Sequence, residues 1–193
     1  MTTIINTSYI KKAVLLHLFL LVSCITGAQE LAMKTNTLGW ISGSMNLGLE
    51  WASGEKSTVL VQAQYNPWDL GENKKIKHVW VQPEYRFWWK NAFAGSFTGI
   101  HLNWANYNIG KVSPITVLKD HRFQGNAIGC GITYGCQWML GTYWNLEASL
   151  GVGYLHIHYK KYGPEVGDKL LKESFSNYVG PYQIGLSLSY FIK

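Results

Sequence analysis

Apolar and polar residues alternate one by one along much of the chain. The pattern is clearest over residues 182–192, where every even position is apolar. The odd positions there are glutamine, glycine and serine, with Phe191 as the exception. A side-chain period of two is typical of a β-strand with one apolar and one polar face. Residues 182–192 are therefore predicted to form such a strand.

Seven further segments repeat this alternation, so the chain is predicted to contain eight strands. The other seven lie at about residues 33–41, 45–51, 59–65, 78–89, 99–104, 128–138 and 144–154. The two faces of the first strand are the hardest to tell apart. In the other strands no charged residue falls on the apolar face. This face must meet either the core of a sandwich or lipid.

The links between the predicted strands alternate in length. Those after the second, fourth and sixth strands are short, and three others are long, at residues 66–77, 108–122 and 160–177. Short periplasmic turns and long outer loops are the pattern of outer-membrane barrels. Only the link near Ser42, which would be an outer one, is short. The alternation of link length favours lipid around the apolar face.

Large aromatic residues gather at both ends of the predicted strands. At the short-turn end they are Trp51, Trp89, Trp138, Trp144 and Tyr190, and at the long-loop end they are Tyr65, Trp104, Tyr154 and Tyr182. In an antiparallel sheet they form two rings, as in the aromatic girdles at membrane interfaces. A sandwich gives no reason for this sorting. We therefore predict an all-β fold, an eight-stranded antiparallel up-and-down transmembrane β-barrel.

One proline interrupts the fourth predicted strand. Pro83 has no backbone N–H, so it removes a hydrogen bond from the ladder in the middle of the strand. We expect a bulge or a kink at this position.

The N-terminal segment has the features of an export signal. Two lysines precede an apolar run over residues 13–22, and Ala28 is a small residue suited to cleavage. Residues 1–28 are therefore predicted to be a signal peptide, and residues 29–193 an outer-membrane β-barrel. The alternative is a lipoprotein box that ends at Cys24, which would be cut before that residue and lipidated.

The C-terminal strand resembles the signal by which outer-membrane barrels are recognised for insertion. The matching residues are Gln183, Gly185, Leu188 and Tyr190. The resemblance implies contact with the barrel-assembly machinery and a location in the cell outer membrane.

The polar faces of the predicted strands point into the barrel. The expected interior polar network consists of Glu50, Gln82, Glu84, Arg86, His101, Asn103 and Glu147, with Gln62, Gln64, His78, Gln137 and Asn145 on the same faces. An eight-stranded barrel is just wide enough for side chains to fill it. Arg86 is the one clear inward cation, and a buried charge must be paired. We favour a structural plug over the alternatives, a conducting path or a catalytic carboxylate–histidine set.

Two pairs of residues suggest other chemistry only weakly. His156 and His158 share a face near the outer end of the seventh strand, but two histidines without a third ligand are a weak metal signal. Cys130 and Cys136 lie six residues apart on one strand, about 20 Å. They cannot form a disulfide with each other. The sequence therefore predicts no metal and no cofactor.

The long links are basic. They hold ten lysine and arginine residues and six acidic residues, a net charge of about +4. Two interpretations stay open, contact with glycolipid phosphates or ordinary solvated loops. No base-reading or stacking motif suggests nucleic acid. The expected partners are outer-membrane lipid, glycolipid phosphates and the barrel-assembly machinery.

Several short motifs resemble those of one family. They are residues 34–36 (KTN), 46–50 (NLGLE), 65–68 (YNPW), 82–86 (QPEYR), 99–102 (GIHL), 107–110 (YNIG), 144–148 (WNLEA), 151–154 (GVGY) and 180–181 (GP). The chain resembles a family of small, uncharacterised outer-membrane β-barrel proteins of Bacteroidetes type, a domain of unknown function. The resemblance spans nearly the whole predicted barrel. It implies a barrel and an outer-membrane location, and it brings no activity, ligand or catalytic residue.

The expected function is a structural, adhesive or envelope-organising role for a small outer-membrane barrel with a plugged interior. The alternatives are an enzyme that modifies outer-membrane lipid and a narrow pore. Lys75, Lys119 and Lys169 are expected to face the cell exterior, and Lys56 and Lys90 the periplasm.

Overall fold

The computed structural model describes residues 30–69, 75–110, 121–163 and 168–192. The chain divides into two compact units with the boundary after Glu30, and the fold described below belongs to the second. The predicted signal peptide, residues 1–28, and Lys119 lie outside the described residues. Among the described residues, no helix is both long enough and apolar enough to span a membrane.

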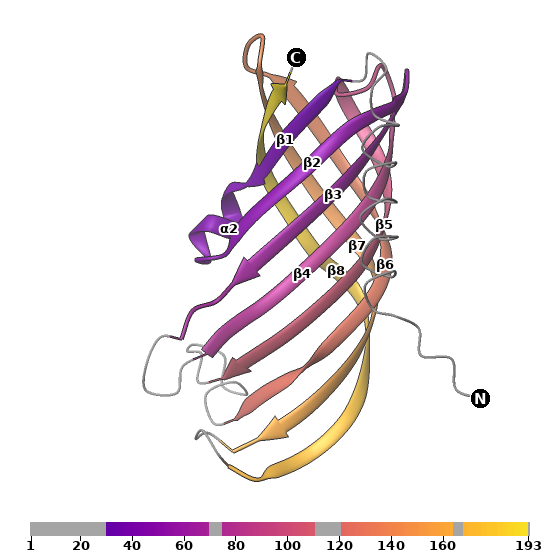
Figure 1. Cartoon of the computed structure of the whole chain (residues 1–193). Coiled ribbons are helices and arrows are strands. Elements are labelled where there is room, and N and C mark those ends of the chain that lie inside the picture. The colour runs from indigo at the N-terminus through magenta and orange to yellow at the C-terminus, as the bar shows by residue number, and fades with distance from the viewer. Residues whose placement is uncertain (1–29, 70–74, 111–120, 164–167, 193) are drawn as a thin grey trace, which may run out of the picture. The chain divides into compact units, whose positions relative to one another are not determined.

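Eight antiparallel strands follow one another around a closed ring (Figure 1). Each strand pairs with its neighbours in chain order, and the last pairs with the first. This up-and-down order of eight antiparallel strands confirms that part of the prediction. The elements are β1 (Leu31–Asn36), α2 (Thr37–Ile41), β2 (Met45–Gly54), β3 (Ser57–Asn66), β4 (Lys75–Trp88), β5 (Gly95–Gly110), β6 (Arg122–Met139), β7 (Trp144–Tyr162) and β8 (Leu170–Ile192).

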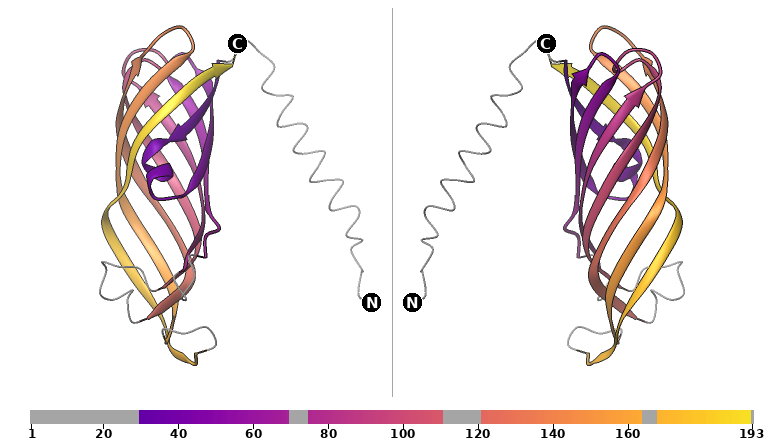
Figure 2. Two further views of the ribbon diagram at one scale, coloured as in Figure 1. Left: turned by 90° about the vertical axis from the view of Figure 1, so that its left-hand side faces the viewer. Right: turned by 90° about the vertical axis from the view of Figure 1, so that its right-hand side faces the viewer.

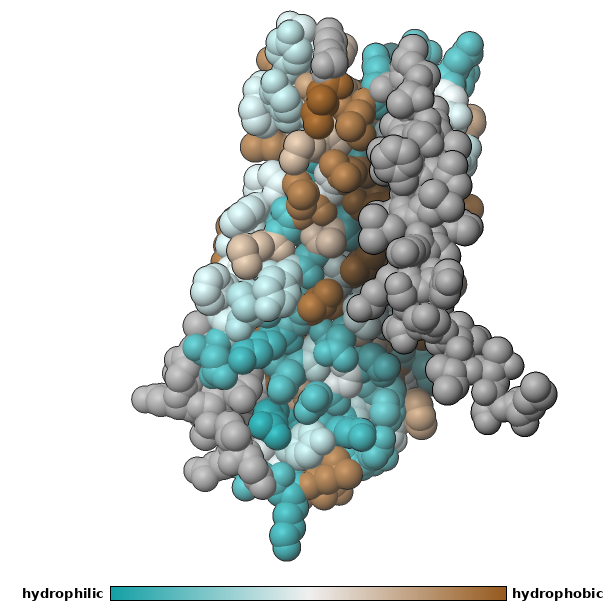
Figure 3. Space-filling model, in the orientation of Figure 1, coloured by the Kyte–Doolittle hydropathy of each residue, from teal (hydrophilic) through white to brown (hydrophobic). Residues whose placement is uncertain are grey.

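The links between strands are short at one end of the ring, which we call the turn end, and longer at the other, which we call the long end. At the turn end, residues 55–56, 89–94 and 140–143 link the strands, and at the long end residues 67–74, 111–121 and 163–169 do so. Strands β6, β7 and β8 run furthest toward the long end (Figure 2). On the surface seen in Figure 3, apolar residues gather toward the turn end and hydrophilic residues toward the long end.

Alternation along each strand separates the two sides of the wall. In β2, buried and exposed side chains alternate over Met45–Glu50, and in β4 they do so from Gln82 to Trp88. The exposed set is apolar and aromatic, whereas most of the fully buried side chains are polar or charged. A soluble protein shows the opposite arrangement. The polar interior is therefore the place to look for a site.

The structure corrects the first predicted strand. Residues 33–41 do not form one strand, because β1 ends at Asn36 and the helix α2 follows. The Asn36 side chain caps the helix by accepting a hydrogen bond from the Leu38 backbone N–H at 3.1 Å. Gly43 then takes a positive φ of 73° in the turn to β2. A single helical turn leaves too few residues for a helical period to show in the sequence.

The structure also corrects the long links. Much of the predicted link at residues 160–177 is paired strand, because β7 continues to Tyr162 and β8 begins at Leu170. Pairing also extends β4 to Lys75 and β5 to Gly110. Both faces of these extensions carry polar residues, so they lack the alternation that identifies a half-apolar strand. The contrast in link length is smaller than predicted.

No bulge occurs at Pro83. It pairs with Val61 in β3, and on the β5 side the ladder is interrupted and resumes in the same register, Val81 with Trp104 and Glu84 with His101. The missing N–H therefore removes a bond on one side of β4 without inserting a residue. Of the two predicted outcomes at Pro83, the bulge is wrong and the kink stays a prediction.

Candidate functional site

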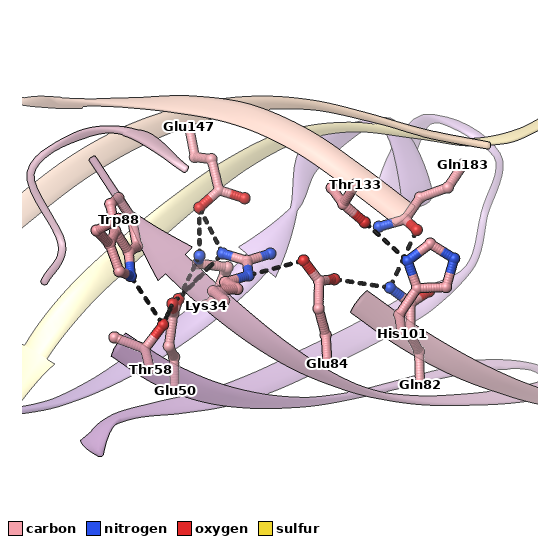
Figure 4. A network of polar contacts seen from close by, with 11 residues as sticks. Lys34, Glu50, Thr58, Gln82, Glu84, Trp88, His101, Thr133, Glu147 and Gln183 are labelled. Carbon is pink, nitrogen blue, oxygen red and sulfur yellow. Dashed lines mark hydrogen bonds and ion pairs between the residues drawn. The ribbon is translucent and has the colours of Figure 1, made fainter. Parts of the chain in front are cut away.

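Five charged side chains from four strands meet in the middle of the ring (Figure 4). We call them the ion cluster, and they are Lys34, Glu50, Glu84, Arg86 and Glu147. Arg86 contacts all three carboxylates, with nitrogen–oxygen distances of 3.0 Å to Glu84, 2.9 Å to Glu147 and 3.3 Å to Glu50. Lys34 Nζ lies 2.5 Å from Glu50 and also contacts Glu147.

The ion cluster is buried and carries unequal charge. Each of its side chains is at most 2% exposed. Two cations face three carboxylates, so its formal charge is −1. Buried charges are tolerated only when they are paired and hydrogen-bonded, and removing one partner commonly costs about 3–5 kcal/mol. The ion cluster therefore ties β1, β2, β4 and β7 together at one level of the ring.

Sequence reasoning missed Lys34 as the second interior cation. The inward face of the first strand was unclear because β1 is only six residues long and the alternation ends at α2. Two signals were present. Ala32 and Lys34 have the same parity, and Lys34 begins the first of the family motifs. A lone lysine on the small-residue face of a short strand needs a buried carboxylate, and Glu50 supplies it across the β1–β2 ladder.

An aromatic cap closes the interior at the turn end, next to the ion cluster. It consists of Trp88, Phe93, Phe97 and Phe191, with ring centroids 4.8 Å apart for Trp88–Phe97 and 5.0 Å apart for Phe93–Phe191. Trp88 donates to Thr58 Oγ1 at 2.9 Å, which donates to Glu50 at 2.7 Å. The Arg86 guanidinium lies 4.3 Å from the centre of the Phe97 ring. Phe191, the exception to the alternation, thus faces inward.

Amide and hydroxyl groups form a layer on the other side of the ion cluster. Gln82 donates to Glu84 at 2.9 Å and to Gln183 at 3.0 Å (Figure 4). His101 Nδ1 lies 2.8 Å from the Thr133 hydroxyl, and His101 Nε2 lies 2.5 Å from the Tyr182 hydroxyl. The structure thus places Gln82, His101 and Asn103, all expected in the interior, beside the ion cluster.

The structure contradicts the prediction that Tyr182 belongs to the outer aromatic ring. Its hydroxyl points inward and accepts a hydrogen bond from Asn103 Nδ2 at 2.7 Å. The cause is a β-bulge, because Gly151 pairs with Gln183 and Val152 with Pro181, so that Tyr182 is an extra residue. Beyond the bulge the odd positions of β8 face outward, as shown by the pairing of Val179 with the outward Tyr154.

The other eight predicted ring aromatics face outward, but the outer ring is not at the strand ends. Trp89, Trp138, Trp144 and Tyr190 are exposed at the turn end, with Trp51 partly buried there. Trp104 and Tyr154 are exposed in the middle of β5 and β7, which continue to Gly110 and Tyr162, and Tyr65 is exposed near the end of β3. Strands β5 and β7 therefore extend past the outer aromatic ring toward the long end.

The remaining predicted residues lie as follows. Gln183 and Gly185 face inward, and Leu188 and Tyr190 outward, on β8. Gln64 lies 3.1 Å from His78 Nε2, and Asn145 donates to the Phe93 carbonyl at 3.5 Å. Gln137 is buried, with both amide atoms unpaired among the described residues. Cys130 and Cys136 are free thiols.

His156 and His158 form a partly exposed stack rather than a metal centre. Both rings stack on Phe175, with centroids 5.4 and 4.7 Å away. His158 Nε2 lies 2.9 Å from Glu173. Within the described ranges, no group of three or more histidine, cysteine or acidic side chains is placed to hold a metal ion.

Two of the three hydroxyl–histidine contacts of the interior involve buried hydroxyl groups that no substrate can reach. Thr133, beside His101, is 1% exposed, and Ser44, which is 3.5 Å from His78 Nε2, is fully buried. A catalytic hydroxyl must be activated by a base and reach its substrate. Both ring nitrogens of His101 are already engaged by hydroxyl groups. At Thr133 and Ser44 the geometry fixes the side chains rather than activating a nucleophile, whereas the third hydroxyl, that of Tyr182, belongs to a residue that lines the cavity described next.

A cavity of about 210 Å³ lies between the ion cluster and α2. Its floor includes Arg86 and Glu147. More than half of its lining residues carry an amide or a hydroxyl group, and they include Asn36, Gln62, Gln64, Gln82, Ser149, Tyr182, Gln183 and Ser187. Leu38, Trp80 and Ile184 add apolar surface. A second cavity of about 180 Å³ adjoins it, shares Trp80 and Tyr182 with it, and is lined further by Asn103, Ala105, Ala127 and Leu155.

The chain belongs to a family of proteins of unknown function, DUF3575, whose model matches residues 14–192. The match covers every strand of the ring. No curated protein matches the chain.

Proposed function

We propose that the protein is a small outer-membrane β-barrel with a structural, adhesive or envelope-organising role and a plugged interior. The observation that carries this proposal is the inverted distribution of side chains across the wall. Charged residues are buried inside the ring, and large apolar residues are exposed outside it. Water on both sides of the wall would make this arrangement unfavourable, whereas lipid outside makes it favourable.

The spacing of the aromatic rings supports a membrane span. Trp144 and Tyr154 are both exposed on β7 and lie ten residues apart. A tilted transmembrane strand needs about 9–11 residues to cross the hydrocarbon core. The exposed side chains of β7 between these two residues include Leu150 and Val152. The eleven residues from Trp144 to Tyr154 are therefore the proposed span.

The blocked turn end of the interior supports a plug rather than a pore. The ion cluster crosses the ring, and the aromatic cap fills the turn end beneath it. An eight-stranded barrel has an interior of about side-chain width. Single-channel recording in planar bilayers tests this part of the proposal, and a steady conductance of porin size would contradict the plug.

Export and orientation are further parts of the proposal. The signal-like segment and the C-terminal insertion motif favour delivery to the outer membrane by the barrel-assembly machinery. The long end would then face outward, because outer loops exceed periplasmic turns in length. Basic residues lie at that end, and they would meet lipid or glycolipid phosphates. The described ones include Lys77, Arg122, Lys160, Lys161, Lys169 and Lys172.

Cysteine labelling of intact cells tests the location and the orientation together. Lys169 is exposed at the long end and Lys90 at the turn end, so Lys169→Cys and Lys90→Cys are matched reporters. A membrane-impermeant maleimide is expected to label position 169 in intact cells and position 90 only after lysis. Labelling of position 90 but not 169 would reverse the orientation. Recovery of the chain outside the membrane fraction would overturn the proposal.

A further inference from the structure

The wall of the ring is incomplete on one side near the cavity. Pairing between β1 and β8 ends with Asn36 and Ser187, and in the described part of the chain the rest of β8 toward the long end pairs with β7 alone. The helix α2 covers part of the free edge of β8. Thr37 donates to the Leu186 carbonyl at 2.7 Å, and Asn36 donates to the Ile184 carbonyl at 3.3 Å. Figure 2 shows α2 beside β8 in its left view.

The cavity reaches the outer surface at this edge. Ile184 pairs with the exposed Leu150, faces outward and is 67% exposed, yet it lines the cavity together with the inward Gln183. Leu38 lines the cavity from α2. The cavity mouth therefore lies between α2 and β8, with apolar side chains at its rim and polar side chains within.

The cavity mouth extends from the outer aromatic ring at α2 toward the middle of the proposed span, because Ile184 pairs with Leu150. Exposed Trp40 and Ile41 lie on α2, and the Trp68 indole donates to the Gly43 carbonyl at 2.5 Å, next to that helix. Tyr65 pairs with Met45, the first residue after the same turn. Aromatic residues of this kind sit at the head-group level of a bilayer. If the proposed function holds, the mouth faces lipid head groups at α2 and the adjoining hydrocarbon at Ile184.

The chemistry of the cavity selects an uncharged polar group. Most of its polar lining is neutral, and amides and hydroxyls both donate and accept hydrogen bonds. The floor belongs to an ion cluster of formal charge −1, in which Arg86 and Lys34 are already paired. A phosphate placed there would meet excess negative charge at low dielectric. The cavity is thus unfavourable for an anion and favourable for hydroxyl groups.

Some of the lining groups have unused hydrogen-bonding capacity. Among the described residues, the side chains of Gln62, Ser149 and Ser187 make no hydrogen bond, and Ser187 is 4% exposed. Buried polar groups are normally satisfied by protein, water or ligand. The cavity volume of about 210 Å³ is below the ~300–1,000 Å³ of pockets that enclose a drug-sized ligand. It suits a head group rather than a whole lipid.

We propose that this cavity binds the uncharged, hydroxyl-rich head group of a membrane amphiphile, such as a sugar ring, entering between α2 and β8. The hydroxyls contact Gln62, Ser149 and Ser187, and Trp80 offers an aromatic wall. The apolar chain leaves past Leu38 and Ile184 into the bilayer. This inference rests on the proposed membrane location and adds a ligand class to it.

Binding of two detergents with equal alkyl chains tests the head-group preference. The folded full chain is purified in an amine-oxide detergent and titrated with an alkyl glucoside or with an alkyl phosphocholine, with binding followed by calorimetry. Saturable glucoside binding at one site, with weaker phosphocholine binding, is expected. Free glucose should compete with the glucoside, and inorganic phosphate should not. Equal binding of both detergents, or competition by phosphate alone, would overturn the proposal.

The variant Gln62→Leu localises the binding. Gln62 has no side-chain partner to lose, so the ring should fold, and glucoside affinity should fall about tenfold as hydrogen bonds to the ligand are lost. Gln124→Leu is the matched control, because Gln124 is exposed on β6 at the long end, and it should bind as the wild type does. Binding that is unchanged in Gln62→Leu would place the glucoside elsewhere and contradict the assignment.

The labelling experiment on Lys90 and Lys169 separates the two proposals. If the membrane location fails, that experiment loses its sidedness whatever the detergents do. If only the cavity proposal fails, sidedness is kept and the response to Gln62→Leu is absent.

Discussion

The two halves of the ring differ in the polarity of their strand faces and in the pairing of β8. The turn half, from the short links to Tyr65, Trp104 and Tyr154, has an apolar outer surface and a charged or aromatic interior. The long half, beyond these residues, has polar side chains on both faces of β7 and β8 and an unpaired β8 edge. A strand whose outer face lies in lipid needs apolar side chains at its outward positions. It also needs every backbone N–H and C=O to be hydrogen-bonded within the sheet, because no water is present to bond them. In the proposed membrane, water around the long half would relax both requirements.

The two halves also differ in how many strands their interior contacts join. In the turn half, side chains from four strands are joined by the ion cluster, so a change in one strand leaves charges stranded on others. In the long half, contacts such as the bond between Tyr154 and Asn177 at 2.9 Å are exposed and involve neighbouring strands. Stability should therefore be concentrated in the turn half.

Arg86→Met should give the largest loss of stability. The variant leaves three buried carboxylates with Lys34 alone, and the free energy of unfolding should fall by about 3–5 kcal/mol. The measurement is the urea midpoint of the refolded protein, read from heat-modifiable gel mobility. Lys172→Met, on the exposed face of β8, is the control and should change it by less than about 0.5 kcal/mol. A midpoint equal to that of the wild type would remove the case for a structural plug and revive a functional role for Arg86.

Leu150→Arg should be the next most harmful change. Leu150 is 53% exposed in the middle of the proposed span, and an arginine there should destabilise the membrane-inserted form by about 2–4 kcal/mol. Val179→Arg, at a position 79% exposed beside the outer ring, should cost about 0–1 kcal/mol. Refolding into vesicles at increasing urea measures both. Similar losses for the two variants would mean that the turn half does not lie in lipid.

Two tyrosines give the smallest and most local comparison. Tyr182→Phe removes a hydroxyl that contacts His101 and Asn103 in the interior, and should cost about 1–3 kcal/mol. Tyr154→Phe removes an exposed hydroxyl and should cost less than about 0.5 kcal/mol. The same urea titration reports the difference. A larger effect at Tyr154 would show that the bulge at Tyr182 does not determine the interior packing.

The sequence predicted the turn half better than the long half, for physical reasons. A strand with one apolar and one polar face can be recognised by the period of two in its sequence, as in residues 182–192. The extensions of β7 and β8 are polar on both faces and show no such period. The reversal of faces at Tyr182 depends on one inserted residue in the ladder, which alternation alone cannot reveal. Lys34 escaped because β1 is short, and the partners of Arg86 could be named only as candidates, since register decides which carboxylates meet.

The cavity could not be predicted from the sequence at all. Its mouth exists because β1 stops at Asn36 and a single turn of helix takes the place of further strand. The polar lining residues Gln62, Gln64 and Gln183 were visible as inward residues or as part of the insertion motif. That they line one cavity becomes visible only in the closed ring, which brings β3 and β8 around the same space.

Spin-label accessibility at two exposed positions tests the central claim, that lipid surrounds the turn half and water the long half. Nitroxide labels replace Leu150 on β7 and Phe175 on β8, which are 53% and 64% exposed. In vesicles, oxygen should relax the label at 150 more than a water-soluble nickel chelate does, and the chelate should be the stronger relaxant at 175. Strong relaxation by the chelate at position 150, equal to that at 175, would contradict the account.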